Sequence, residues 1–194
     1  MWLVLVVIAG VFLGRIFPFE MPKDLSMAVL TVLVFFAGMN AASEEEALLK
    51  IAKNFHIIII LAIMTITGTF LGAALLSFFI PLTLKEAILA TSGLGWYSLS
   101  GIMLTNLYSP YLGSIAFVSN VLRESFAILL VPWIAKFSKY GAVSAAGATS
   151  MDTLLGVVTK STDAETSLIS FGHGVLLTTL IPFLIPMLLY LFSK

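Results

Sequence analysis

Long apolar runs alternate with short polar links along the whole 194-residue chain. A helix needs about 20 mainly apolar residues to cross the hydrocarbon core of a bilayer, so these runs predict membrane-spanning helices. Five runs are continuous and two are interrupted by small and polar residues. The continuous runs are residues 2–17, 25–42, 55–80, 114–137 and 167–192, and the interrupted runs are residues 87–107 and 141–158. The pattern predicts an all-α polytopic membrane bundle, formed by residues 1–194 as one domain, with two broken or re-entrant segments.

The composition supports a helical membrane protein and excludes several other classes. Hydrophobic residues make up 60% of the chain and charged residues 10%, with a mean hydropathy of +1.10, which is incompatible with a soluble domain. Ten basic and ten acidic residues balance, so the chain has no basic surface of the kind that binds nucleic acid. The absence of cysteine excludes disulfide and thiol chemistry. We also predict no metal ion and no cofactor.

The first interrupted run is broken at residues 93–101, which contain three glycines, two serines, Trp96 and Tyr97. Glycine allows the backbone to bend or unwind, and non-helical backbone at membrane depth occurs only where protein buries it or it lines a wet cavity. We therefore interpret this stretch as a broken helix whose two aromatic residues form a pocket wall. Close helix packing by the glycines and an interfacial position for the aromatic residues are the alternatives.

The second interrupted run is broken at residues 147–152, where Ser150 lies between Thr149 and Asp152. The spacing of Thr149 and Asp152 predicts a capping box that starts a half-helix inside the membrane. Half-helix N-termini at such breaks carry spare N–H groups, and broken-helix transporters use them to hold substrate carboxylates. The two breaks together predict a binding site near the membrane midplane.

Charged residues inside membrane spans are costly and mark functional sites by default. Asn120 and Glu124 are one turn apart in the same run, so their side chains share a helix face. Arg123 lies about 100° around that helix, and we expect it to pair with Asp152 on another segment. A buried structural ion pair is the alternative. If all three groups are ionised, the cluster carries one net negative charge, which a cationic substrate, a proton or Na⁺ would neutralise.

Other polar positions add to this picture. His173, between two glycines in the last run, is a candidate proton carrier; a hydrogen-bonded structural histidine is the alternative. Two further capping boxes are predicted, with Thr83 and Glu86 starting one helix and Thr162 and Glu165 starting another.

At these residues the sequence resembles the lysine exporter LysO family of prokaryotic membrane proteins. The resemblance covers this whole chain and about the C-terminal two-thirds of a full-length member. It implies that a multi-pass protein exports L-lysine, and toxic analogues such as thialysine, across the cytoplasmic (inner) membrane. It also implies either that a separate small membrane subunit supplies the helices found at the N-terminus of other members, or that this chain works without them, as a homodimer. The matching positions are residues 93–101, Leu104, Thr105, Asn120, Arg123, Glu124, residues 147–152, His173 and Gly174.

The resemblance and the polar residues together predict a transporter that exchanges lysine for protons, and not an enzyme. We expect half-helix N–H groups, Ser98 and Ser100 to hold the lysine carboxylate, and Trp96 or Tyr97 to flank its alkyl stem. Either Asp152 or Glu124 meets the ε-ammonium, and the other acid carries the coupling proton, with a pKa raised by burial. The predicted substrate and proton site comprises Glu124, Asp152, Asn120, Arg123, Trp96, Tyr97, Ser98, Ser100, Thr149, Ser150 and His173.

Three alternatives use the same residues differently. An intramembrane serine protease would pair Ser98 or Ser100 with His173 as a dyad. A cation/proton antiporter of other specificity would keep the acids and change the substrate. A non-catalytic assembly subunit would also keep these acids but would not export lysine.

Overall fold

The computed structural model describes residue 13 and residues 45–193. Contacts divide the chain into two units, residues 1–45 and 46–194, and nearly all of the described residues belong to the second. The predicted spans 2–17 and 25–42 lie outside the described residues. They stay predictions, and so does the single domain.

The described part of the chain is helical and contains no strand. Its long helices are α4 (Phe55–Leu76), α7 (Pro110–Ile134) and α10 (Ala164–Leu191), and the short helix α3 (Glu45–Lys53) precedes α4. These three long helices are sufficiently long and apolar to cross a membrane. The predicted helical membrane bundle is therefore confirmed.

Both interrupted runs form two helices separated by a break. The first run gives α5 (Leu84–Thr91) and α6 (Tyr97–Leu107), and the second gives α8 (Lys139–Ala146), a 3₁₀ turn η1 (Gly147–Met151) and α9 (Leu155–Ser161). The 8-residue α5 and α8 are each about 12 Å long at 1.5 Å per residue, far short of the roughly 30 Å hydrocarbon core. The breaks predicted from the glycines are thus present as irregular backbone between half-helices.

Two predicted capping boxes have different outcomes. The Thr83–Glu86 box forms, with both reciprocal hydrogen bonds at the start of α5. The Thr162–Glu165 box is wrong, because α10 begins one residue later and Asp163 caps it by accepting from the Thr166 N–H. Asp163 is also bonded to Lys139, and this bond lowers the pKa of the Asp163 carboxyl to about 2. An ionised Asp163 accepts N–H bonds better than the neutral Thr162 hydroxyl, which accounts for the shift.

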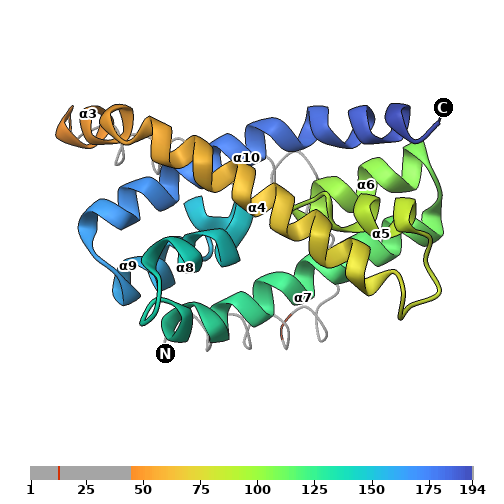
Figure 1. Ribbon diagram of the computed structural model, residues 1–194, viewed down its shortest axis with the longest axis horizontal. Coiled ribbons are helices and arrows are strands. Elements are labelled where there is room, and N and C mark those ends of the chain that lie inside the picture. Colours follow the sequence, from red (N-terminus) through yellow and green to blue (C-terminus); the bar gives the residue numbers. More distant parts are fainter. Residues whose placement is uncertain (1–12, 14–44, 194) are drawn as a thin grey trace. The chain divides into compact units, whose positions relative to one another are not determined.

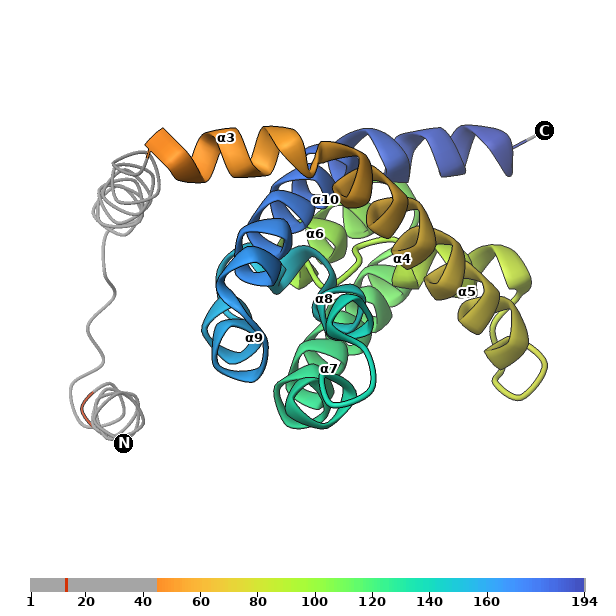
Figure 2. The ribbon, with the colours of Figure 1, turned by 60° about the vertical axis from the view of Figure 1, so that its left-hand side comes forward.

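The helices pack so that both breaks lie inside the bundle. Figures 1 and 2 show α6 running beside α7 and α8 lying against the other part of α7, while α4 packs on α10. Apolar side chains fill most of the interior, and ten polar side chains of the described residues are buried among them. Large apolar side chains such as Phe78 and Phe79, 83% and 85% exposed, point outwards. This distribution is the one expected of a helical bundle whose outer surface faces lipid. Every buried side-chain nitrogen or oxygen in the described residues has a hydrogen-bond partner.

Candidate functional site

Asn120 of α7 holds the first break in place. Its side-chain oxygen accepts a hydrogen bond from the Gly95 N–H at 2.8 Å, and its amide nitrogen donates to the carbonyls of Ala90 at 3.0 Å and Ala116 at 2.8 Å. The side chain is only 2% exposed. Asn120 therefore satisfies backbone groups that the end of α5 leaves unpaired, and it positions the break without contacting the pocket described below.

The backbone of the first break passes through the left-handed region. Leu94 has φ of 49° and Gly95 has φ of 110°. Glycine adopts this region without steric cost, whereas a leucine there is strained. The contacts of Asn120 and of the second break hold Leu94 in this conformation.

The two breaks meet at one backbone hydrogen bond, which the Ala148 N–H donates to the Leu94 carbonyl at 2.9 Å. Gly147, with φ of 64°, precedes this bond. A Cβ on Gly147 would lie 2.4 Å from the Leu94 carbonyl oxygen and 2.8 Å from Nη2 of Arg123. Glycine at this position therefore allows both the close crossing and the approach of the Arg123 guanidinium to it.

The η1 turn of the second break is fixed to α10. The Ser150 hydroxyl donates to the Ser170 carbonyl at 2.9 Å, and the Ser170 hydroxyl donates back to the Ser150 carbonyl at 2.9 Å. The Ser150 hydroxyl oxygen also lies 3.0 Å from Nδ1 of His173. Ser150 and His173 are completely buried, so they form the support behind the break and not a surface open to substrate.

A cavity of about 270 Å³ lies between the two breaks. Asp152 is the charged residue among the described residues that line it, and its exposed carboxylate accepts from the Thr153 N–H at 2.6 Å. The Tyr97 ring, at the same wall, packs edge-on against Phe117 of α7 with centroids 5.4 Å apart. The cavity thus combines one carboxylate with aromatic and hydroxyl groups. Its lining comprises Gly95, Trp96, Tyr97, Ser98, Ala148, Thr149, Met151, Asp152, Thr153 and Thr178.

The predicted site residues divide into three groups. Five line the cavity: Trp96, Tyr97, Ser98, Thr149 and Asp152. Four are buried polar groups behind it: Ser100, Asn120, Ser150 and His173. The other two, Arg123 and Glu124 of α7, are half-buried and do not line this cavity.

Two predicted contacts among these residues are wrong. Arg123 donates to the Thr69 hydroxyl at 3.2 Å and to the Ser144 carbonyl at 3.3 Å, and it forms no ion pair with Asp152. The capping box of Thr149 and Asp152 does not form, because the Thr149 hydroxyl donates backwards to the Ala146 carbonyl. The segment is a 3₁₀ turn whose next α-helix begins only at Leu155, so a box with α-helical spacing has no helix start to cap.

The geometry also contradicts a serine–histidine dyad. Ser100 is fully buried and donates to the Trp96 carbonyl at 2.9 Å, whereas both ring nitrogens of His173 contact other hydroxyls, those of Ser150 and Thr65. Ser98 lines the cavity but is not among the partners of His173. Neither Ser98 nor Ser100 therefore forms the nucleophile–base pair with His173 that an intramembrane serine protease requires.

Five lining residues are not among the predicted site residues. Gly95, Ala148 and Met151 belong to the predicted breaks, whereas Thr153 and Thr178 lie outside them. Thr178 and Thr179 are adjacent threonines in an otherwise apolar stretch of α10, and each donates to a carbonyl one turn earlier, Thr178 to Gly174 at 2.9 Å and Thr179 to Val175 at 2.8 Å. Only the folded arrangement shows that Thr178 lines the cavity. Met151 and Thr153 flank Asp152 and carried no separate signal.

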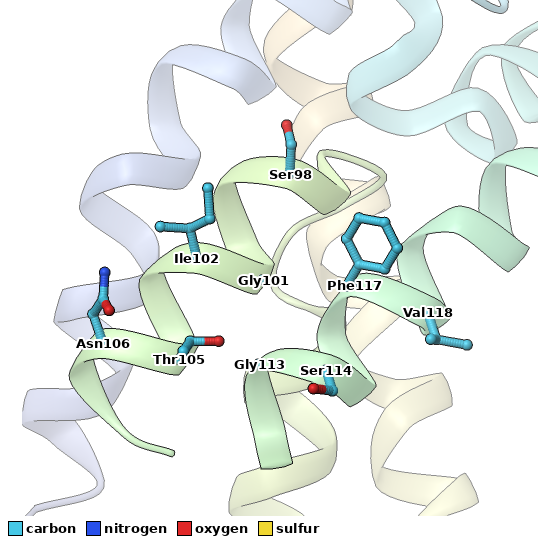
Figure 3. A pocket seen from close by; sticks show the side chains of 9 residues that line it. All are labelled: Ser98, Gly101, Ile102, Thr105, Asn106, Gly113, Ser114, Phe117 and Val118. Atoms are coloured by element: carbon cyan, nitrogen blue, oxygen red, sulfur yellow. The ribbon is translucent and has the colours of Figure 1, made fainter. Parts of the chain in front are cut away.

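A larger cavity of about 520 Å³ opens between α6 and α7. Figure 3 shows Ser98, Ile102, Thr105 and Asn106 lining it from α6, and Ser114, Phe117 and Val118 from α7. No charged residue is among the described residues that line it. A cationic substrate would therefore leave its charge unpaired there, and the smaller cavity with Asp152 is the better candidate site.

Comparison with known proteins places these features in a family. The sequence model described as "Lysine exporter LysO" matches residues 4–189. A candidate lysine exporter of Haemophilus influenzae is 32% identical over 190 residues, covering 97% of this chain and 95% of that protein. The lysine exporter LysO of Escherichia coli K12 is 33% identical over 162 residues, 84% of this chain and 54% of that protein. No solved structure matches. With its multi-pass helical fold, the chain belongs to the lysine exporter LysO family, whose members are membrane transporters and not enzymes.

Proposed function

We propose that this chain exports L-lysine, together with close analogues such as thialysine, through the cavity between the two breaks and in exchange for protons. The observation that carries the proposal is the position of Asp152, whose carboxylate lines a cavity bounded by both broken segments. Lysine is the cation that the family name specifies. The cytoplasmic membrane is the location we expect, and a small membrane subunit or a second copy stays the predicted partner.

The residues that line the cavity determine the orientation in which we propose lysine binds. Asp152 takes the ε-ammonium, because a carboxylate is the strongest partner for an amine in a site of this polarity. Trp96 or Tyr97 flanks the alkyl stem and supplies an aromatic face near the cation.

The lysine carboxylate points to the start of α6. Trp96 at the N-cap makes no side-chain capping bond. The Tyr97 N–H donates to the Gly95 carbonyl at 3.0 Å, so the next N–H groups of the first turn of α6, together with the Ser98 hydroxyl, are the donors that we propose for an anion there. Ser100 was also expected to hold the carboxylate, but its hydroxyl is buried and bonded to Trp96, so we omit it from the substrate site.

Glu124 is the acid that we propose carries the coupling proton. It lies one turn after Asn120 on α7, is half-buried, and does not line the lysine cavity. Separate positions for the two acids allow lysine and the proton to occupy different groups during exchange. This assignment follows from placing the ε-ammonium on Asp152.

The experiment that tests the function is efflux of labelled lysine from vesicles that contain the purified chain alone, with and without a pH gradient. We expect gradient-dependent efflux, competition by unlabelled lysine and thialysine, and no competition by norleucine, which has a similar stem without the ε-ammonium. Equal competition by norleucine would contradict the role of Asp152. Absence of lysine binding as well as flux would contradict the lysine site itself.

Glu124→Gln is expected to abolish the response of export to the pH gradient while leaving lysine binding within about twofold of wild type, because the amide cannot carry a proton. Binding and gradient-driven flux are measured on the same vesicles. Glu165→Gln is the matched control, since Glu165 is exposed and accepts from the Asn54 amide, a bond that glutamine also accepts. Wild-type gradient response in Glu124→Gln would remove Glu124 from the coupling step.

A further inference from the structure

His173 lies directly behind the wall of the lysine cavity. The wall includes Thr149 and Met151 of η1, and between them Ser150 contacts Nδ1 of His173 at 3.0 Å. On its other edge, Nε2 of His173 lies 3.0 Å from the Thr65 hydroxyl oxygen of α4. The ring is completely buried, so its nitrogens depend for hydrogen bonds on these two hydroxyl groups and on the nearby Leu61 carbonyl.

The hydrogen bonds of Ser150 determine which nitrogen of the neutral His173 ring carries the proton. Ser150 has one hydroxyl proton, and its oxygen lies 2.9 Å from the Ser170 carbonyl, which can only accept. With that proton donated to Ser170, the Ser150 oxygen accepts from the ring. Both bonds are satisfied together only when Nδ1 of His173 carries a proton, which leaves Nε2 as the nitrogen that gains or loses one.

Thr65 can serve Nε2 in either state. Its oxygen also lies 2.8 Å from the Leu61 carbonyl and 2.8 Å from the Ser144 hydroxyl. When Nε2 is bare, the Thr65 hydroxyl donates to it and Ser144 donates to Thr65. When Nε2 is protonated, it donates to the Thr65 oxygen, and the Thr65 hydroxyl turns to the Leu61 carbonyl. Neither state leaves a ring nitrogen without a partner, so protonation does not incur the usual loss of a buried hydrogen bond.

The charge that faces His173 is positive. Arg123 of α7 acts electrostatically on the ring, and it is joined to the same network through the Ser144 carbonyl. From the other packed elements, α4, α8 and η1, the described groups that contact the ring network are the hydroxyls and carbonyls named above. A proton on Nε2 therefore adds a second positive charge beside Arg123, next to the cavity proposed for the lysine cation.

We infer that His173 is a proton-binding site, with Nδ1 always protonated and Nε2 exchanging a proton by rotation of the Thr65 hydroxyl, and that proton binding there opposes lysine binding across the η1 wall. The inference rests on the proposed lysine site at Asp152. His173 would then be a second proton-binding residue besides Glu124. The bound proton and the bound lysine would affect each other through charge repulsion and not through a shared carboxylate.

The chain is well suited to a direct test because it contains two histidines. His56 is exposed, so His56→Gln leaves one imidazole, which ¹⁵N-histidine labelling and NMR observe alone. We expect the neutral ring to be the Nδ1–H form and Nε2 to become protonated as the pH is lowered from about 8 to about 3, a range that extends well below ordinary imidazole titration because the ring is buried beside Arg123. An Nε2–H neutral form, or no change over this range, would overturn the inference.

Thr65→Val removes the rotating hydroxyl and is expected to shift the protonation midpoint by at least about one pH unit, a tenfold change in proton affinity. Thr67→Val is the matched control, because Thr67 is exposed on the same helix two residues away. An equal midpoint in both variants and in wild type would contradict the role of Thr65.

The second part of the test measures how lysine binding and His173 protonation affect each other. Saturating lysine is expected to lower the protonation midpoint of His173, and protonation is expected to weaken lysine binding about tenfold, an effect that His173→Gln abolishes. If Asp152→Asn prevents lysine binding but lysine leaves the His173 midpoint unchanged in the wild-type site, the lysine site stands and the inferred repulsion is wrong. If Asp152→Asn binds lysine normally, the proposed function fails at its site, and the NMR titration without lysine still decides whether His173 binds a proton.

Discussion

Asp152→Asn is expected to abolish lysine export while the protein remains folded and inserted. A hydrogen bond to a charged group contributes about 1.5–3 kcal/mol, so loss of the carboxylate should weaken lysine binding about 10- to 150-fold. Asparagine keeps the size of the side chain and can still accept from the Thr153 N–H. The local turn is therefore retained, and the loss reports on charge.

The measurement is equilibrium binding of labelled lysine followed by flux in vesicles. Asp163→Asn is the matched control: Asp163 is an acid outside the cavity, and an asparagine oxygen still caps α10 by accepting from the Thr166 N–H. We expect this control to bind and export lysine as wild type does. Wild-type flux in Asp152→Asn would show that the ε-ammonium is held elsewhere.

Asn120→Ala is expected to destabilise the backbone conformation of the first break more than any other proposed substitution. The variant leaves the buried Gly95 N–H without its acceptor, which costs about 1–3 kcal/mol, whereas the Ala90 carbonyl keeps a contact from the Ser119 hydroxyl. The left-handed conformation of Leu94 then loses a restraint, and the wall formed by Trp96 and Ser98 moves. We expect a lower melting temperature and at least about tenfold weaker lysine binding.

Asn106→Ala provides the control for this variant. Asn106 is exposed on α6 and lines the larger cavity that lacks a charged residue, so the same substitution there should leave stability and lysine binding near wild type. If Asn120→Ala lowers the melting temperature but binds lysine with wild-type affinity, the break does not need Asn120 to shape the cavity. A strong loss in Asn106→Ala would instead point to the larger cavity as part of the substrate path.

The sequence predicted the breaks well because their signal is local. Glycines and hydroxyls inside an apolar run are costly against lipid, and the helices are broken at residues 92–96 and 147–154. The predicted stretch 93–101 extends beyond the first break, because residues 97–101 already form the first turn of α6. Asp152 was predicted for the same reason, since an ionisable group in a membrane segment needs a wet or polar surrounding.

What the sequence could not provide was the pairing of polar groups across helices. Ser100 and Asn120 were expected to contact substrate, yet unsatisfied backbone groups lie closer to them and take their hydrogen bonds. Arg123 was expected to form an ion pair with Asp152. Its long side chain instead donates to the Ser144 carbonyl on α8 and to the Thr69 hydroxyl on α4. Thr178 lacked any local signal, because it reaches the cavity lining only through the fold that brings α10 to the second break.

The single backbone bond between Leu94 and Ala148 has a consequence for protein engineering. Each break supplies half of that bond, and α7 supplies both Asn120, which shapes the first break, and Arg123, which lies against the second. A chimera that exchanges residues 84–107 alone with a relative at 32–33% identity would place a foreign carbonyl at position 94 against the original Asn120 and Gly147. The smallest segment that can be transplanted with its own crossing intact is therefore residues 84–151.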